Sequence, residues 1–382
     1  MLTSFTSVFG PGLPPRFVRA PGRVNLIGEH TDYNNGFVFP MAIAPEIRLA
    51  FRPRADGVVR FASTLRQAKF VEFRLADTLA PHPEPKHWSN YLMGPVHFLK
   101  LAGVPLVGID ALVDNTLPEG SGLSSSAALE VAVVRSMLLA AGQTMSYDRV
   151  ALICQQAEHA FPKAPVGIMD MTASAGGRAG HAMLLDCRSL EVTHVPLPEA
   201  DLRVVILNTR VQHSLAGGAG EYAVRRRQCE TAAQFFSAKS LRDVSLTAVL
   251  AAEKHLDPVV FRRARHVVTE IQRCLDAAAA LRAGQYERTG ELMLASHASL
   301  RDDYEVSCPE LDFMSEQAMT VKGVYGARMT GGGFGGSAIA LCQPRAVEPL
   351  TAHILAAYPK RFGKTPDILA TPATDGAGEY TP

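Results

Sequence analysis

The order of hydrophobic and polar positions divides the chain into strand-like and helix-like segments. Short runs rich in β-branched and aromatic residues, bounded by Gly and Pro, predict strands at residues 16–20, 37–43, 47–51, 107–113, 204–208 and 337–342. Longer segments with apolar residues at helical spacing predict helices at residues 88–101, 127–141, 147–160, 223–236 and 258–282. Several strands follow one another without strict strand–helix alternation, so the pattern predicts an α+β fold.

The length predicts more than one structural unit. At about 150 residues per domain, 382 residues correspond to two or three domains. We place a boundary near Pro198, which gives an N-terminal lobe of residues 1–198 and a C-terminal lobe of residues 199–382. The last eight residues are expected to be loosely held.

Charge and cysteine content narrow the class of protein. The chain has 38 Lys and Arg against 37 Asp and Glu, and this balance argues against nucleic-acid binding, which needs a surplus of basic residues. No apolar run approaches the roughly 18 residues of a membrane helix, and residues 1–15 lack the features of a signal peptide. Six scattered cysteines without a CxxC pair suit a reducing compartment. We expect a cytoplasmic enzyme that does not bind membranes and acts as a monomer.

A Gly-Ser loop is the first candidate for chemistry. A strand-like segment leads into Gly120–Ser126 and then into a helix. Glycines and free N–H groups at a helix start favour phosphate, and serine hydroxyls can donate to phosphate oxygens or ligate Mg²⁺. A single Ser N-cap is the simpler alternative, but three serines after two glycines favour an anion site. The loop is not a Walker A motif, and protein-kinase motifs are missing from the chain.

A second glycine-rich loop covers residues 331–336. Gly331, Gly333 and Gly336 match GxGxxG literally, but a strand-like run follows where a dinucleotide fingerprint needs a helix. We therefore expect a loop whose backbone closes over a ligand, with a plain tight turn as the alternative.

A polar segment at residues 21–36 concentrates charged side chains between apolar strands. Arg23, Glu29, His30 and Asp32 fall within ten residues. Carboxylates beside a histidine suit hydrogen bonding to sugar hydroxyls, and a solvated hairpin loop is the alternative. Asp170 follows two apolar residues, and it could equally cap a helix that begins at the next residue.

These segments together resemble the galactokinase family of the GHMP small-molecule kinases. Residues 23–34 are similar to the galactokinase signature, residues 118–128 to the phosphate-binding motif and residues 329–336 to the third motif. Further similar segments follow in family order and spacing at residues 167–170, 186–189, 213–216, 222–230 and 306–311. The resemblance implies a two-lobed fold. The N-terminal lobe would have a mixed sheet with helices, the C-terminal lobe an antiparallel sheet with helices, and the active site would lie in the cleft between them.

The resemblance also implies an activity and a set of site residues. The reaction would be ATP-dependent phosphorylation of the C1 hydroxyl of galactose, with ATP and Mg²⁺ bound. Asp170 and Arg23 would form the catalytic pair. The residues implied for the sugar are Glu29, His30, Asp32, Gly167, Asp170 and Tyr222. Those implied for the nucleotide are Gly120, Ser121, Gly122, Leu123, Ser124, Ser125, Ser126, Trp88 and Tyr91. Ser126 and Glu158 would ligate Mg²⁺.

Two departures from the family pattern affect the sugar end of the site. Met171 stands where galactokinases usually carry Gln, and the segment 216–221 before Tyr222 is about two residues longer and richer in Gly. They keep two alternatives open. One is a kinase for another galactose-like sugar, such as N-acetylgalactosamine or a C6-altered hexose. The other is a regulator that binds galactose and ATP without turnover.

Overall fold

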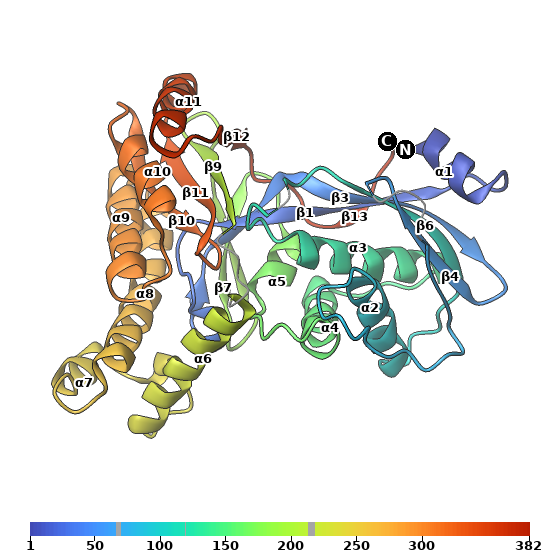
Figure 1. Ribbon diagram of the computed structural model, residues 1–382, viewed down its shortest axis with the longest axis horizontal. Coiled ribbons are helices and arrows are strands. Elements are labelled where there is room, and N and C mark those ends of the chain that lie inside the picture. The colour runs from blue at the N-terminus through green and yellow to red at the C-terminus, as the bar shows by residue number, and fades with distance from the viewer. Residues whose placement is uncertain (66–69, 119, 213–217) are drawn as a thin grey trace.

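The structure is a computed structural model, and it describes residues 1–65, 70–118, 120–212 and 218–382. A six-stranded sheet forms the first part of the molecule (Figure 1). Its strands, in order across the sheet, are β13 (Gly378–Glu379), β1 (Arg16–Asn25), β3 (Pro40–Arg54), β6 (Gly108–Asn115), β4 (Val58–Ser63) and β5 (Val71–Arg74). Only the β4–β6 pair is parallel among these strands, so the sheet is mixed.

Helices cover the two faces of this sheet unequally. Figure 1 shows α2 (Asn90–Leu101), α3 (Ser125–Ala140), α4 (Tyr147–Ala160) and α5 (Met169–Gly176) on one side of this sheet. Buried side chains of these helices and of the sheet form the main core. The short helix α1 (Leu2–Phe9) belongs to a separate small cluster. Phe17 joins that small cluster, whereas the next residue, Val18, joins the main core. This is the alternation that a strand imposes on successive side chains.

A four-stranded antiparallel sheet organises the second part. Its order is β10 (Val324–Thr330), β11 (Gly335–Cys342), β9 (Arg203–Gln212) and β12 (Asp367–Thr371). The helices of this part are α6 (Gly218–Phe235), α7 (Leu246–Ala251), α8 (Pro258–Arg282), α9 (Tyr286–Asp302), α10 (Pro309–Met319) and α11 (Val347–Phe362). A smaller sheet of β2 (Phe37–Val38), β7 (His181–Asp186) and β8 (Val192–Pro196) completes the strands that pair within the described residues.

These elements confirm the α+β prediction. Helices α4 and α8 have the predicted bounds, and β11 confirms that a strand follows the second glycine-rich loop, where a dinucleotide fingerprint would need a helix. The prediction of two full strands at residues 37–43 and 47–51 was wrong, because one long strand, β3, runs through most of both. Pro45 does not break β3, since it falls where the pairing with β1 is interrupted by a bulge, one of the sites where a strand accepts proline.

The expected looseness of the last eight residues was also wrong. In β13, Gly378 and Glu379 pair with β1, and the Glu379 carboxylate accepts two hydrogen bonds from Arg16. Just before β13, Gly376 N–H donates to the Gly177 carbonyl and Ala377 N–H to the Ser174 carbonyl. The segment is therefore fastened both to the first sheet and to the end of α5. Within the described ranges, no helix is long and apolar enough to cross a membrane.

Candidate active site

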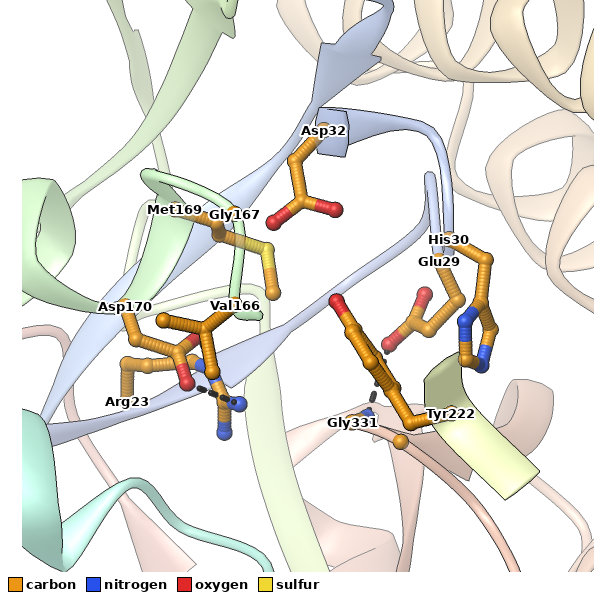
Figure 2. A pocket seen from close by; sticks show the side chains of 11 residues that line it. Arg23, Glu29, His30, Asp32, Val166, Gly167, Met169, Asp170, Tyr222 and Gly331 are labelled. Atoms are coloured by element: carbon orange, nitrogen blue, oxygen red, sulfur yellow. Dashed lines mark hydrogen bonds and ion pairs between the residues drawn. The ribbon is translucent and has the colours of Figure 1, made fainter. Parts of the chain in front are cut away.

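A cavity lies where segments from both parts of the chain meet (Figure 2). Its empty volume, which includes space open to solvent, is about 430 Å³. The residues that line it are Arg23, Glu29, His30, Asp32, Val166, Gly167, Met169, Asp170, Tyr222, Gly331 and Gly332. The structure thus brings together the whole predicted sugar set and the predicted catalytic pair, from positions far apart in sequence.

Arg23 and Asp170 form a bidentate ion pair on one side of the cavity. Arg23 Nε lies 2.8 Å from Asp170 Oδ1, and Arg23 Nη2 lies 2.9 Å from Asp170 Oδ2. Arg23 extends from β1 and is almost fully buried, whereas Asp170 is partly open to the cavity. Asp170 sits in the first turn of α5, which begins at Met169, so the alternative of Asp170 as the cap of a helix starting at the next residue was wrong.

The Gly-Ser loop reaches the same ion pair. Ser124 precedes α3 with a φ of 61°, and its side chain makes no capping hydrogen bond. Its hydroxyl donates instead to Asp170 Oδ2 at 2.6 Å. Arg23 Nη1 donates to the carbonyl oxygen of Gly122 at 2.7 Å. The simple N-cap interpretation therefore fails for Ser124, and the loop is joined directly to the cavity.

Other members of the loop anchor it to neighbouring strands. The Leu123 carbonyl accepts from the Arg23 N–H at 3.2 Å, and the Ser121 carbonyl accepts from Ser337 Oγ, on β11, at 2.7 Å. Gly120 and Gly122 have φ values of 66° and 72°, which favour glycine. Both glycine-rich loops are thus held against each other at the cavity.

Glu29 is held by an arginine that the sequence did not single out. Arg328, on β10, is fully buried and lies 2.6 Å from Glu29 Oε2, while the Gly331 N–H donates to Glu29 Oε1 at 2.9 Å. Burial raises the pKa of Glu29 to about 7, although the Arg328 charge works in the other direction. Arg328 also lies 4.0 Å from Glu270, on α8. The buried charges of Arg328, Glu29 and Glu270 thus hold in place the part of the cavity wall that Glu29 lines.

Asp32 and Gly167 fit closely against each other. Burial, and next the negative charge of Asp170, raise the pKa of Asp32 to about 6. A Cβ atom at Gly167 would lie 1.7 Å from Asp32 Oδ2. Any larger residue at position 167 would therefore force the Asp32 carboxylate to move. Sequence reasoning selected both residues but could not show this contact.

His30 and Tyr222 close another side of the cavity. Their ring centroids lie 5.5 Å apart, and Figure 2 shows the Tyr222 side chain entering the cavity from α6. His30 has a φ of 63°, a strained value for a residue other than glycine. Its ring also contacts Tyr33 and Tyr304.

The predicted metal and adenine residues lie outside the lining of this cavity. Glu158, on α4, is buried and hydrogen-bonded to Ser126, at the start of α3. Burial, and next the charge of Asp170, raise the pKa of Glu158 to about 8. Trp88 is buried, and Tyr91, on α2, is half-buried and feels the Glu158 charge. These residues form a second group on the Gly-Ser loop side of Asp170.

The two departures from the family pattern lie differently in the structure. Met171 is fully buried in the main core and does not line the cavity. In the segment 216–221, residues 216–217 lie outside the described residues, as does the similar segment 213–216, and α6 begins at Gly218. Met171 therefore gives no direct contact that would select another sugar.

Comparisons with known proteins agree with this geometry. The galactokinase galactose-binding signature matches residues 3–53, the GHMP kinase N-terminal domain residues 90–178 and the GHMP kinase C-terminal domain residues 277–360. Galactokinase of Homo sapiens is 47% identical over 98% of this chain and 94% of its own length. Galactokinase of Chloroflexus aggregans is 44% identical over 98% and 95%.

A solved structure gives the same result. Lactococcus lactis galactokinase complexed with galactose superposes with a TM-score of 0.94 at 34% identity, over 99% of this chain and 98% of that one. A mevalonate kinase from L. major shares the fold, with a TM-score of 0.63 at 20% identity. The two sheets and the joined glycine-rich loops therefore define a GHMP kinase, an ATP-dependent small-molecule kinase. Within that class, the chain belongs to the galactokinase family.

Proposed function

We propose that the cavity binds galactose with its C1 hydroxyl toward Asp170 and that the Gly-Ser loop presents the γ-phosphate of ATP beside it. The observation that carries this proposal is the joint position of Arg23, Asp170 and Ser124. A carboxylate, an arginine and the phosphate-loop serine share direct hydrogen bonds at the edge of the cavity. Phosphoryl transfer depends on such alignment and charge stabilisation.

The hydrogen bonds on Asp170 indicate which oxygen takes the proton. A carboxylate offers about two acceptor positions on each oxygen. Within the part of the chain that the structure describes, Oδ2 already accepts from Arg23 Nη2 and Ser124 Oγ, whereas Oδ1 accepts only from Arg23 Nε. Oδ1 therefore keeps one position for the sugar hydroxyl.

The proposed reaction balances without another reactant. The C1 oxygen forms a bond to the γ-phosphorus as the bond from that phosphorus to the β,γ-bridging oxygen breaks. The hydroxyl proton passes to Asp170 Oδ1, and ADP leaves. Arg23, whose Nη groups lie between Asp170 and the Gly122 carbonyl, would stabilise the charge on the transferring group.

The nucleotide end has donors that suit Mg²⁺. Glu158 and Ser126 offer hard oxygen ligands, and Mg²⁺ typically takes only one or two protein ligands beside phosphates and water. Among the residues described, no cluster of three or more His, Cys, Asp or Glu side chains could hold a metal alone, which agrees with a site completed by substrate. We propose that Ser126 and Glu158 hold Mg²⁺. When bound, the ion would neutralise phosphate charge.

The remaining sugar and nucleotide roles follow from position. Glu29, His30, Asp32 and Tyr222 would hold the sugar hydroxyls, and Gly167 would leave room for Asp32 beside the sugar. Residues 120–126 would wrap the phosphates. Trp88 and Tyr91 would flank the adenine.

Asp170→Asn tests the catalytic assignment. Loss of the base should lower kcat by about 10²–10⁴-fold, with little change in ATP affinity measured by calorimetry. The matched control, Asp276→Asn, alters an exposed carboxylate on α8 and should leave kcat unchanged. An Asp170→Asn enzyme with near-parental kcat would show that Asp170 is not the base.

A sugar panel tests the substrate. ADP release with galactose, 2-deoxygalactose, N-acetylgalactosamine, galacturonate and glucose should give the highest kcat/KM for galactose, by tenfold or more. Binding of galactose and ATP without turnover would instead favour the regulator. We also propose a cytoplasmic monomer whose lobes divide near residue 198, and sedimentation at micromolar concentration tests the monomer.

A further inference from the structure

The shape of the sugar cavity depends on how helix α6 is held, because α6 carries Tyr222. The Tyr222 ring centroid lies 5.5 Å from that of His30 and 5.2 Å from that of Tyr33. On its other side, a Cβ atom placed on Gly332 would lie 4.0 Å from Tyr222 Cδ2. Figure 2 shows the ring between His30 and the glycine-rich loop. A small shift of α6 would therefore move the ring within the cavity.

Arg225, one turn after Tyr222, ties this part of α6 to the segment that follows α9. The Arg225 side chain is almost fully buried, and residue 225 is only 7% exposed. Its Nε donates to the Tyr304 carbonyl at 2.8 Å, and its Nη2 donates to the Glu305 carbonyl at 2.9 Å. Its Nη1 donates to the Glu221 carboxylate at 3.1 Å, within α6. Hydrogen bonds from a charged donor are stronger than neutral ones, so two neighbouring carbonyls hold the helix firmly.

The same segment also holds the second glycine-rich loop. The Val306 carbonyl accepts a hydrogen bond from the Phe334 N–H at 2.7 Å. The guanidinium carbon of Arg225 lies 5.7 Å from the centroid of the Phe334 ring. Gly331 and Gly332 of this loop line the cavity. Arg225 thus stands where α6, residues 304–306 and the glycine-rich loop meet, and its bonds fix the first of these relative to the other two.

The next arginine on α6 offers a weaker tie in another direction. Arg226 Nη1 donates to the Pro165 carbonyl at 3.2 Å, and its Nε pairs with Glu230 at 3.1 Å. This pair is partly exposed, and exposed ion pairs contribute little to stability. The buried, forked contact of Arg225 with two carbonyls is therefore the stronger constraint on α6.

We propose that Arg225 is a positioning residue that sets the place of the Tyr222 ring in the sugar cavity by tying α6 to residues 304–306. Residues three apart on a helix are neighbours, so the bonds of Arg225 act on the turn that carries Tyr222. Arg225 is not among the described residues that line the cavity, and it acts through Tyr222. The proposal deepens the proposed galactose site and rests on it for the identity of the ligand.

Fluorine NMR of the full chain, labelled with 3-fluorotyrosine, follows the Tyr222 ring directly. Tyr222→Phe identifies its signal among the nine tyrosines. Arg225→Lys keeps the charge, but a single ammonium cannot reproduce the planar fork that bonds both carbonyls. We expect the Tyr222 signal to move in Arg225→Lys and to stay in place in Arg227→Lys, which alters an exposed arginine of the same helix. An unchanged Tyr222 signal in Arg225→Lys would overturn the proposal.

Kinetics separate a positioning role from a merely structural one. Arg225→Lys should raise the KM for galactose about three- to tenfold, as expected when part of a charged hydrogen-bond pair is lost, with kcat and the KM for ATP nearly unchanged. Equal rises of both KM values, together with a lower Tm, would show a structural role and overturn the proposal. Arg227→Lys should match the parent.

A double substitution tests the route through Tyr222. In a Tyr222→Ala background, Arg225→Lys should add almost nothing to the KM for galactose, because residues that act through one another are not additive. A full added loss there would overturn the proposal. If the parent enzyme shows no galactose turnover, the proposed function fails, while the fluorine signal still decides whether Arg225 positions Tyr222.

Discussion

The close contact between Gly167 and Asp32 allows the geometry of the sugar site to be tested by adding a single carbon atom, in Gly167→Ala. In Gly167→Ala, the new Cβ would lie 1.7 Å from Asp32 Oδ2 and 2.1 Å from Asp32 Cγ. An ordinary van der Waals contact lies at 3.4–4 Å, so the carboxylate oxygen must move by roughly 1.7 Å, the difference between 3.4 Å and 1.7 Å. A misplacement of about 1 Å in a site can cost about 10²-fold in rate. We therefore expect kcat/KM for galactose to fall about 10²-fold.

The assay is ADP release at varied galactose, with ATP affinity measured separately. ATP affinity should change less than twofold, because the clash is on the sugar side. Gly378→Ala is the matched control, since a Cβ there meets no atom within 4 Å. In an Asp32→Ala background, Gly167→Ala should cost little more, because the clashing group is gone. An unchanged kcat/KM in Gly167→Ala, or an equal loss in both backgrounds, would refute this reasoning.

Three further substitutions test other parts of the site. Arg328→Met should lower the free energy of unfolding in urea by about 3–5 kcal/mol, because it leaves Glu29 buried without its partner; a loss below about 1 kcal/mol would contradict the buried pair. Glu158→Gln should abolish turnover yet raise the Tm of the substrate-free enzyme. The pKa of Glu158 in the folded enzyme is about 8, above its ordinary value, so the stability of the parent enzyme falls as pH rises toward 8. The Tm difference between Glu158→Gln and the parent should therefore widen between pH 6 and pH 8. A Tm difference that stays constant would be inconsistent with this pKa shift. Ser124→Ala, which removes a donor to Asp170, should lower kcat by about tenfold without changing galactose binding, and an unchanged kcat would argue against this positioning.

Contiguous motifs made the cavity residues predictable from sequence. Arg23, Glu29, His30 and Asp32 stand close together in one segment, so their common location needed no knowledge of the fold. Arg328 was missed because its partner, Glu29, is 299 residues away in sequence. Nothing local distinguishes a buried, paired arginine on a strand from a half-exposed one.

Local sequence rules also failed where pairing between distant segments determines the secondary structure. Residues 37–43 and 47–51 were predicted as separate strands, but a bulge against β1 lets β3 continue through Pro45. The elements that were not predicted at all include the helices α1, α7, α9, α10 and α11 and the strands β4, β5, β7, β8, β10, β12 and β13. Strand β12 pairs with β9, more than 150 residues earlier, and such a distant partner leaves little trace in local periodicity. From the sequence alone, Asp170 could equally have been a helix cap. Its ion pair with Arg23 is apparent only in the fold, which brings β1 and the Gly-Ser loop next to it.

The fastening of residues 376–379 has a consequence for the timing of biosynthesis. The edge of β1 stays without its partner, and the end of α5, which carries Asp170, stays without its bonds, until these residues have been synthesised. Chains generally fold from the N-terminus as they emerge, but here the first sheet waits for a strand made more than 350 residues later. A chain that has been made only as far as residue 375 therefore lacks both the strand that pairs with the edge of β1 and the two hydrogen bonds that hold the end of α5.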